Sequence, residues 1–274
     1  MSNEKNSNII RPFAGDHAIV EVSFGFEWES PLSQELLAKL SSLHDLVEND
    51  FPVKREIRQE ISVEVTGTHG HNGEKQTRGD GISTILLDYV EGENSLIRQI
   101  VIEQKRLIFN DFGKYDGWVS VCNRAMAWLL PFLNIIFAER ALRIVGLQYL
   151  DSFEVLTDAP VAPLVFERND FLPEGVFGRL GAWHLHQGYF TELTAPVACM
   201  MLTNLNIRIF RIDQDKQILE VRTSHRAHFD SELLCGSEKL RNVQDALHLE
   251  NKALLAKILL PQIKQAINLD NQET

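Results

Sequence analysis

The chain has 274 residues, 44% of them hydrophobic, so it can bury a large core, and disorder throughout is excluded. Its 27 basic and 38 acidic residues give a formal charge of −11, and the resulting average field disfavours nucleic acid and anionic membrane surfaces as partners. Three scattered cysteines are too few for a disulfide framework or a zinc knuckle, so we expect a reducing, cytoplasmic location.

The first predicted elements are a strand and a helix. Residues 1–15 are polar and lack the apolar stretch of a signal peptide, so we expect a disordered tail. Residues 18–28 then alternate between apolar and polar side chains, which predicts a half-buried strand. Ser30 and Pro31 supply a helix start, and leucines at helical spacing predict an amphipathic helix over residues 32–47.

A glycine-rich segment, residues 66–81, follows the first of three strand-like stretches at residues 55–65, 82–90 and 97–110. The segment has no apolar side chain and predicts an exposed hairpin loop. Its glycines would suit a phosphate-binding loop, but the segment runs into a strand instead of a helix. His69 and His71 could ligate a metal, although no paired acid accompanies them.

The middle of the chain holds a second helix and a long strand. Apolar residues at helical spacing cover most of the circumference over residues 115–140, which predicts a helix buried on most sides. Pro131 should kink this helix or end its first segment. The longest apolar run, residues 128–138, is too short to span a bilayer. Residues 142–153 are apolar on both faces at their centre, which favours a strand in the middle of a sheet.

Residues 156–177 contain three prolines and are the best candidate for a connection between two halves. Beyond them we expect three strands and a long helix, at residues 179–190, 197–212, 217–228 and 241–259. Strands with separate helices, in place of strict alternation, predict an α+β fold with largely antiparallel sheets and segregated amphipathic helices. We place the N-terminal half at residues 16–156 and the C-terminal half at residues 157–274. Each half has strands that end in a helix, which leaves two related halves as an option.

Three strands of the second half each have one apolar and one polar face. If the strands pair in one sheet, the polar faces form one patch that contains His184, His186, Asn204, Asn206, Arg208 and Arg222. Arginine and amide side chains recognise carboxylates and phosphates directionally, so this patch is the candidate site for a ligand or partner. The alternative is the ordinary solvated side of an antiparallel sheet.

Metal and nucleophile chemistry have weaker support. The two histidines of the first strand in this patch could share a metal with His225 or His228, but no acid or cysteine supplies a further ligand that the pattern justifies. Cys122 lies in an apolar helix and Cys199 precedes two methionines, where thiols usually act as small hydrophobes. We therefore assign no catalytic residue, no metal and no cofactor, and we favour a protein that is not an enzyme.

Four short segments recur in order and spacing in one known family. They are Ile19–Val22, Tyr115–Trp118, Gly146–Asp151 and Leu247–His248. In these segments, which extend over most of its length, the chain resembles a sporadically distributed, uncharacterised prokaryotic family whose strand usually reads Gly-Leu-Arg-Tyr-Ile-Asn. The chain carries Gln148 and Asp151 where that family usually has arginine and asparagine. The resemblance implies no established activity or cofactor, and the patchy distribution of the family is typical of accessory genes such as defence or toxin–antitoxin components.

Two hypotheses of function follow. The first is a non-enzymatic cytoplasmic protein that binds another macromolecule, a protein partner, as a regulator, immunity or antitoxin-like component of a defence-type system. The second is a small-molecule-binding or enzymatic domain with its site on the polar sheet face of the C-terminal half, which predicts a deep pocket. We also expect a twofold homodimer, because the C-terminal helix has apolar residues beyond one stripe, namely Leu249, Leu255, Leu259 and Leu260.

Overall fold

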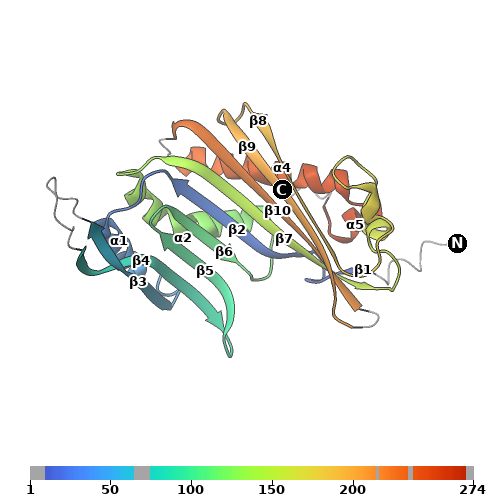
Figure 1. Cartoon of the computed structure of the whole chain (residues 1–274), viewed down its shortest axis with the longest axis horizontal. Helices are drawn as coiled ribbons and strands as arrows, with labels where there is room; N and C mark the ends of the chain where they lie inside the picture. Colours follow the sequence, from blue (N-terminus) through green and yellow to red (C-terminus); the bar gives the residue numbers. More distant parts are fainter. Residues whose placement is uncertain (1–9, 65–74, 214–215, 234–236, 270–274) are drawn as a thin grey trace.

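One large antiparallel sheet organises the molecule (Figure 1). The computed structural model describes residues 10–64, 75–213, 216–233 and 237–269. Within these ranges the strands pair in the order β3-β4-β5-β6-β2-β7-β10-β9-β8, and β1 pairs with the C-terminal end of β7. The strands are β1 Ile10–Pro12, β2 Ile19–Trp28, β3 Val53–Glu64, β4 Lys75–Glu91, β5 Ser95–Glu103, β6 Arg106–Asp111, β7 Leu142–Leu156, β8 Trp183–Leu193, β9 Cys199–Arg211 and β10 Lys216–Leu233.

The two long helices, α2 and α4, lie behind the sheet in the view of Figure 1, and the opposite face of the sheet is open. The α-helices are α1 Gln34–Ser42, α2 Trp118–Phe137, α3 Ala162–Val165, α4 Ser237–Ile258 and α5 Pro261–Ala266. Short 3-10 turns occur at η1 Leu43–Leu46 and η2 Glu174–Val176. This mixture of helices with a dominant antiparallel sheet confirms the predicted α+β class.

Period-two alternation of the strands builds the core between the sheet and the helices. In β2, Val22, Phe24 and Phe26 are buried in the same apolar cluster as the inward face of α2. Glu21 and Glu27 alternate with these residues and therefore project from the open face. A second buried cluster joins β7, β9 and β10 to α4. Removal of so much apolar surface from water is the main stabilising contribution to such a fold.

The chain follows nearly the same path through the sheet twice. β2 leads through α1 to the edge strand β3, and the chain returns through β4 and β5 to β6 beside β2 and enters α2. β7 leads through α3 and η2 to the opposite edge strand β8, and the chain returns through β9 to β10 beside β7 and enters α4. The second path has one strand fewer. The halves predicted at 16–156 and 157–274 share one sheet, because β7 pairs with both β2 and β10.

Two predicted boundaries differ from the structure. The strand predicted over residues 97–110 is the hairpin β5–β6, which turns at Gln104 and Lys105. A turn without glycine, proline or asparagine gives no sequence signal, which explains the error. Of the hairpin loop predicted at residues 66–81, residues 66–74 lie outside the described residues, and β4 already begins at Lys75.

Pro131 does not end the second helix, because α2 runs through it as one element. The flanking Leu129 and Phe132 are fully buried against the sheet, and this tertiary burial outweighs the hydrogen bond that proline cannot donate. Among the described helices, α2 has the length and apolar composition of a membrane span. Core helices of soluble proteins meet the same criterion, and the inward face of α2 belongs to the core.

Candidate functional site

Five of the six predicted site residues meet on the open face of the sheet. Opposite residues in neighbouring strands point to the same face, and the register places His184 beside Arg208 and His186 beside Asn206. The next strand continues these rows with Glu220 and Arg222. Together the side chains line a hollow of about 310 Å³, which we call the donor hollow: His184, His186, Asn206, Arg208, Glu220 and Arg222.

Asn204, the sixth predicted residue, lies one row away and does not line the hollow. It is opposite Gly188, and its Oδ1 atom lies 2.7 Å from the position that a Cβ on Gly188 would occupy. Asn204 therefore fills the space left by a glycine. The structure assigns it to the packing of β8 against β9.

Two ion pairs define the electrostatics of the donor hollow. Arg208 donates from Nε to Glu220, and Arg222 Nη2 lies 3.8 Å from Glu21 Oε2, across the intervening strand β7. The side chains of Arg208 and Arg222 are 57% and 43% exposed, whereas those of Glu220 and Glu21 are 14% and 15% exposed. The hydrogen bond with Glu220 raises the pKa of Arg208 above its ordinary value. The guanidinium groups thus face the solvent and the carboxylates lie beneath them.

The metal set considered for this face is not assembled. His225 points to the helix side of the sheet, where its Nδ1 atom lies 3.1 Å from Thr203 Oγ1 and burial lowers its pKa to about 4. His228 is on the open face, but it lies in a different row, opposite Met200. Among the described residues, no three His, Cys, Asp or Glu side chains are close enough to hold an ion.

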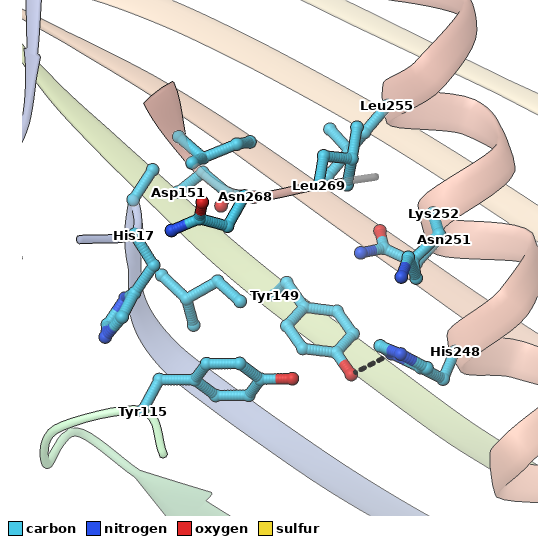
Figure 2. Close-up of a pocket in the computed structure, with 13 residues that line it drawn as sticks. His17, Tyr115, Tyr149, Asp151, His248, Asn251, Lys252, Leu255, Asn268 and Leu269 are labelled. Carbon is cyan, nitrogen blue, oxygen red and sulfur yellow. Dashed lines mark hydrogen bonds between the residues drawn. The ribbon is translucent and has the colours of Figure 1, made fainter. Parts of the chain in front are cut away.

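A small cavity under the sheet contains polar residues that the sequence patterns did not bring together. It has a volume of about 60 Å³ and lies between the end of β7 and α4 (Figure 2). Asp151 and Tyr149 of β7 line one side, and Asn251 and Lys252 of α4 line the other. The cavity is smaller than the pockets of roughly 300–1,000 Å³ that bind typical organic ligands.

Asp151 is the unusual group of this cavity. Its side chain belongs to a residue that is only 2% exposed, and its Oδ2 atom has no hydrogen-bond partner in the described part of the chain. Burial alone raises its pKa to about 7. The carboxyl group therefore exists in both protonation states near neutral pH and can accept or donate a hydrogen bond.

The N-terminal segment closes one side of the same cavity. Residues 10–12, which the sequence places in a tail, form β1 against β7 and lead to His17 in the cavity wall. Within the described ranges of the chain, both ring nitrogens of His17 are buried without a hydrogen bond of good geometry. Burial lowers its pKa, while nearby backbone groups of Ile19 and Tyr115 act in the opposite direction.

An aromatic stack forms the floor beside this cavity. Tyr149 Oη lies 2.8 Å from His248 Nδ1, as the dashed line in Figure 2 shows. The His248 ring stacks on Trp118 at 4.4 Å between centroids, and Trp118 stacks on Phe24 at 5.8 Å. Burial, with a contribution from Lys252, lowers the pKa of His248 to about 4, so its ring is neutral at pH 7.

All four segments that carry the family resemblance therefore meet in one place, although they are far apart in the sequence. They supply Ile19, Tyr115, Trp118, Tyr149, Asp151 and His248. Asp151 carried a sequence signal, because it is an acidic residue within a strand that is otherwise apolar at its centre. His17 carried none, because it lies in a polar stretch outside any periodic pattern.

The described cysteines are poor nucleophiles. Cys122 is fully buried in α2, and burial raises its pKa to about 12. We predict that iodoacetamide at pH 8 leaves Cys122 unlabelled in the native protein and labels it after unfolding in guanidinium chloride, as peptide mass spectrometry would show. Labelling of native Cys122 at the rate of the unfolded chain would contradict this result.

No protein-family model matches the chain and no curated protein is similar to it, so the family resemblance stays a prediction.

Proposed function

We propose that this protein binds a protein partner through the open face of its sheet, and that the donor hollow receives a carboxylate of that partner. The observation that carries this proposal is the orientation of the two ion pairs in the hollow. In both pairs the arginine is about half exposed and the glutamate is sheltered beneath it. A partner that approaches this face therefore meets N–H groups first.

The chemistry of the hollow favours an acceptor. Arg208 and Arg222 present guanidinium donors, Asn206 presents an amide, and the exposed rings of His184 and His186 add further donors. Guanidinium groups match carboxylates in geometry and can donate two parallel hydrogen bonds. A glutamate or aspartate side chain of a partner fits this set better than a basic one.

The charges on this face favour a protein over a nucleic acid as the partner. A nucleic-acid surface needs a track of unpaired basic residues, but arginines elsewhere on the sheet are also paired, as Arg55 is with Asp88 and Arg226 is with Glu27. The chain as a whole carries a formal charge of −11. A partner with one or two well-placed carboxylates needs no excess of positive charge. Such binding fits the cytoplasmic regulator, immunity or antitoxin-like role that the family resemblance suggests.

The alternative function, a small-molecule site on the same face, has less support. The donor hollow lies on an open sheet surface, whereas ligand sites usually bury most of their ligand. The cavity at Asp151, with a volume of about 60 Å³, is too small for an ordinary substrate. A small anion could still occupy the hollow, and the experiment below separates this outcome from peptide binding.

The decisive variant is Arg208→Gln, which removes the charge but keeps a hydrogen-bonding side chain above Glu220. The probe is a fluorescent glutamate-rich peptide, and its affinity is compared with those of single-stranded DNA and citrate. We expect the peptide to bind preferentially and the variant to weaken its binding about tenfold, as loss of one charge-assisted hydrogen bond predicts. Folding should change little, because half-exposed ion pairs contribute roughly 0–1 kcal/mol.

Arg106→Gln is the matched control. Arg106 is also a half-exposed strand arginine that pairs with a glutamate, Glu103, but it lies far from the hollow in β6. It should leave peptide affinity unchanged. Equal weakening by both variants would identify a merely solvated sheet face, and preferential binding of DNA or citrate would overturn the choice of a protein partner.

We also infer that the two repeated paths, β2 to α2 and β7 to α4, are related by a pseudo-twofold axis. The repeated path through the sheet and the antiparallel pairing of β2 with β7 support this inference, with Gly25 opposite Gly146 at the centre. The matching helices α2 and α4 follow β6 and β10 in the two paths.

A further inference from the structure

We propose that β8 pairs with β8 of a second copy of this chain, antiparallel and across a twofold axis, so that one sheet continues through both subunits. The inference goes beyond the proposed partner binding. It depends on the backbone edge of β8, a strand whose His184 and His186 side chains also line the donor hollow.

The first observation is an empty position in the repeated path. Counted outward from the centre of the sheet, the first path (β2 to α2) places β3 outside β4 as its fifth strand. The second path (β7 to α4) ends at β8, which occupies the position that β4 has in the first path. In the described part of the chain, β8 pairs only with β9. The backbone N–H and C=O groups on its outer side are therefore available to an added strand.

The second observation is the contrast between the two sheet edges. β3 carries several charged residues near its start, and its pairing with β4 shifts register twice, at Ile57/Arg58 and at Glu60/Ile61. Charges and bulges of this kind discourage edge pairing. β8 spans 11 residues, contains Glu192 as its one charged residue besides two histidines, and pairs with β9 without any register shift. The β3 edge is therefore protected against pairing with another strand, and the β8 edge is not.

The third observation is the complementarity of β8 with itself. When the twofold axis passes through Gly188, His184 lies opposite Glu192 of the partner subunit, and Trp183 lies opposite Leu193 of the partner subunit. Phe190, which is 64% exposed, then lies opposite the partner's His186. The charged, aromatic and apolar pairs each occur twice across the twofold axis.

The dimer interface predicted on the C-terminal helix is largely buried inside the subunit. Leu255 and Leu259 are buried within the subunit, and Leu260 packs against the same core cluster. Leu249 alone of those four leucines is largely exposed. A dimer through β8 instead places two donor hollows on one continuous face, because His184 and His186 lie on β8 itself. Such a face would bind a partner at two points.

Sedimentation velocity with charge variants tests this interface. The unmodified chain should sediment at micromolar concentration with about twice its mass of 31.2 kDa. Glu192→Lys should weaken the dimer at least tenfold, because lysine would face His184, and adding His184→Glu should restore it by reversing the pair. Ile57→Lys on the other edge, where Ile57 is also exposed, should have no effect. Melting curves confirm that each variant is folded.

Three outcomes would overturn the proposal. One is a chain that still sediments as a monomer when its concentration is raised 50-fold above the micromolar range. Another is a dimer that Glu192→Lys does not weaken, which would place the interface elsewhere or assign the β8 edge to another protein. The last is a folded double variant that fails to dimerise. A monomer that still binds the glutamate-rich peptide would reject the dimer and leave the proposed function intact.

Discussion

Replacement of Trp118 by alanine should lower the free energy of unfolding by roughly 3–5 kcal/mol, the usual cost of truncating a buried tryptophan. Trp118 is 5% exposed and lies between Phe24 and His248 in the aromatic stack. The substitution removes both ring contacts and leaves a cavity where α2, α4 and the sheet meet. Urea unfolding followed by circular dichroism measures the loss.

The variant Trp118→Phe separates the contribution of ring stacking to stability from that of the indole hydrogen bond. The indole Nε1 donates to Asp245 Oδ1 at 2.6 Å, and Asp245 keeps a second donor in Arg241 Nε at 3.1 Å. Phenylalanine retains one six-membered ring between its neighbours but loses the second ring of the indole and this hydrogen bond, so we expect a cost of about 1–2 kcal/mol, less than that of alanine. If alanine and phenylalanine destabilise the protein equally, the stack does not carry the stability assigned to it.

Replacement of Asp151 by asparagine should raise the free energy of unfolding by roughly 2–4 kcal/mol at pH 8. Burial raises the pKa of Asp151 from 3.8 to about 7, so above that pH the folded protein must hold a buried, ionised carboxylate. Asparagine has nearly the same shape and no charge.

The pH dependence gives the sharper test. A carboxyl group whose pKa is raised in the folded state binds more protons folded than unfolded, so its favourable contribution is complete below pH 3.8 and is lost as the pH rises through about 7. The increase in the free energy of unfolding caused by Asp151→Asn should therefore be near zero at pH 4. It should grow up to pH 7 and stay constant at higher pH. Urea unfolding of both proteins across this range measures the difference.

Comparison of the two proteins at each pH removes the effect of the buried histidines. Burial lowers the pKa values of His225 and His248 to about 4. The free energy of unfolding therefore decreases as the pH falls below 6.5, because these histidines bind protons more readily in the unfolded chain. This loss is common to both proteins and cancels in the difference. A gain that is the same at pH 4 and pH 8 would show that folding does not raise the pKa of Asp151, and would contradict the prediction.

Local patterns were sufficient to predict the faces of the strands. Alternation over β8, β9 and β10 assigned His184, His186, Asn206, Arg208 and Arg222 to one side of their strands, and the structure places them together on the open face. The prediction worked because side-chain direction in a strand depends only on the parity of the position. It could not show that Asn204 would be used to fill the space beside Gly188.

The sequence by itself determined the α+β class, the location of most helices and strands, and the polar side of the C-terminal strands. Only the tertiary structure decided the order of the strands in the sheet and therefore which distant side chains meet. It brought Glu21 of β2 to Arg222 across β7, and it buried Asp151 beneath the C-terminal segments. Periodicity records which face a residue takes, but it does not record which strand lies beside it, because that pairing is set by the packing of the whole core.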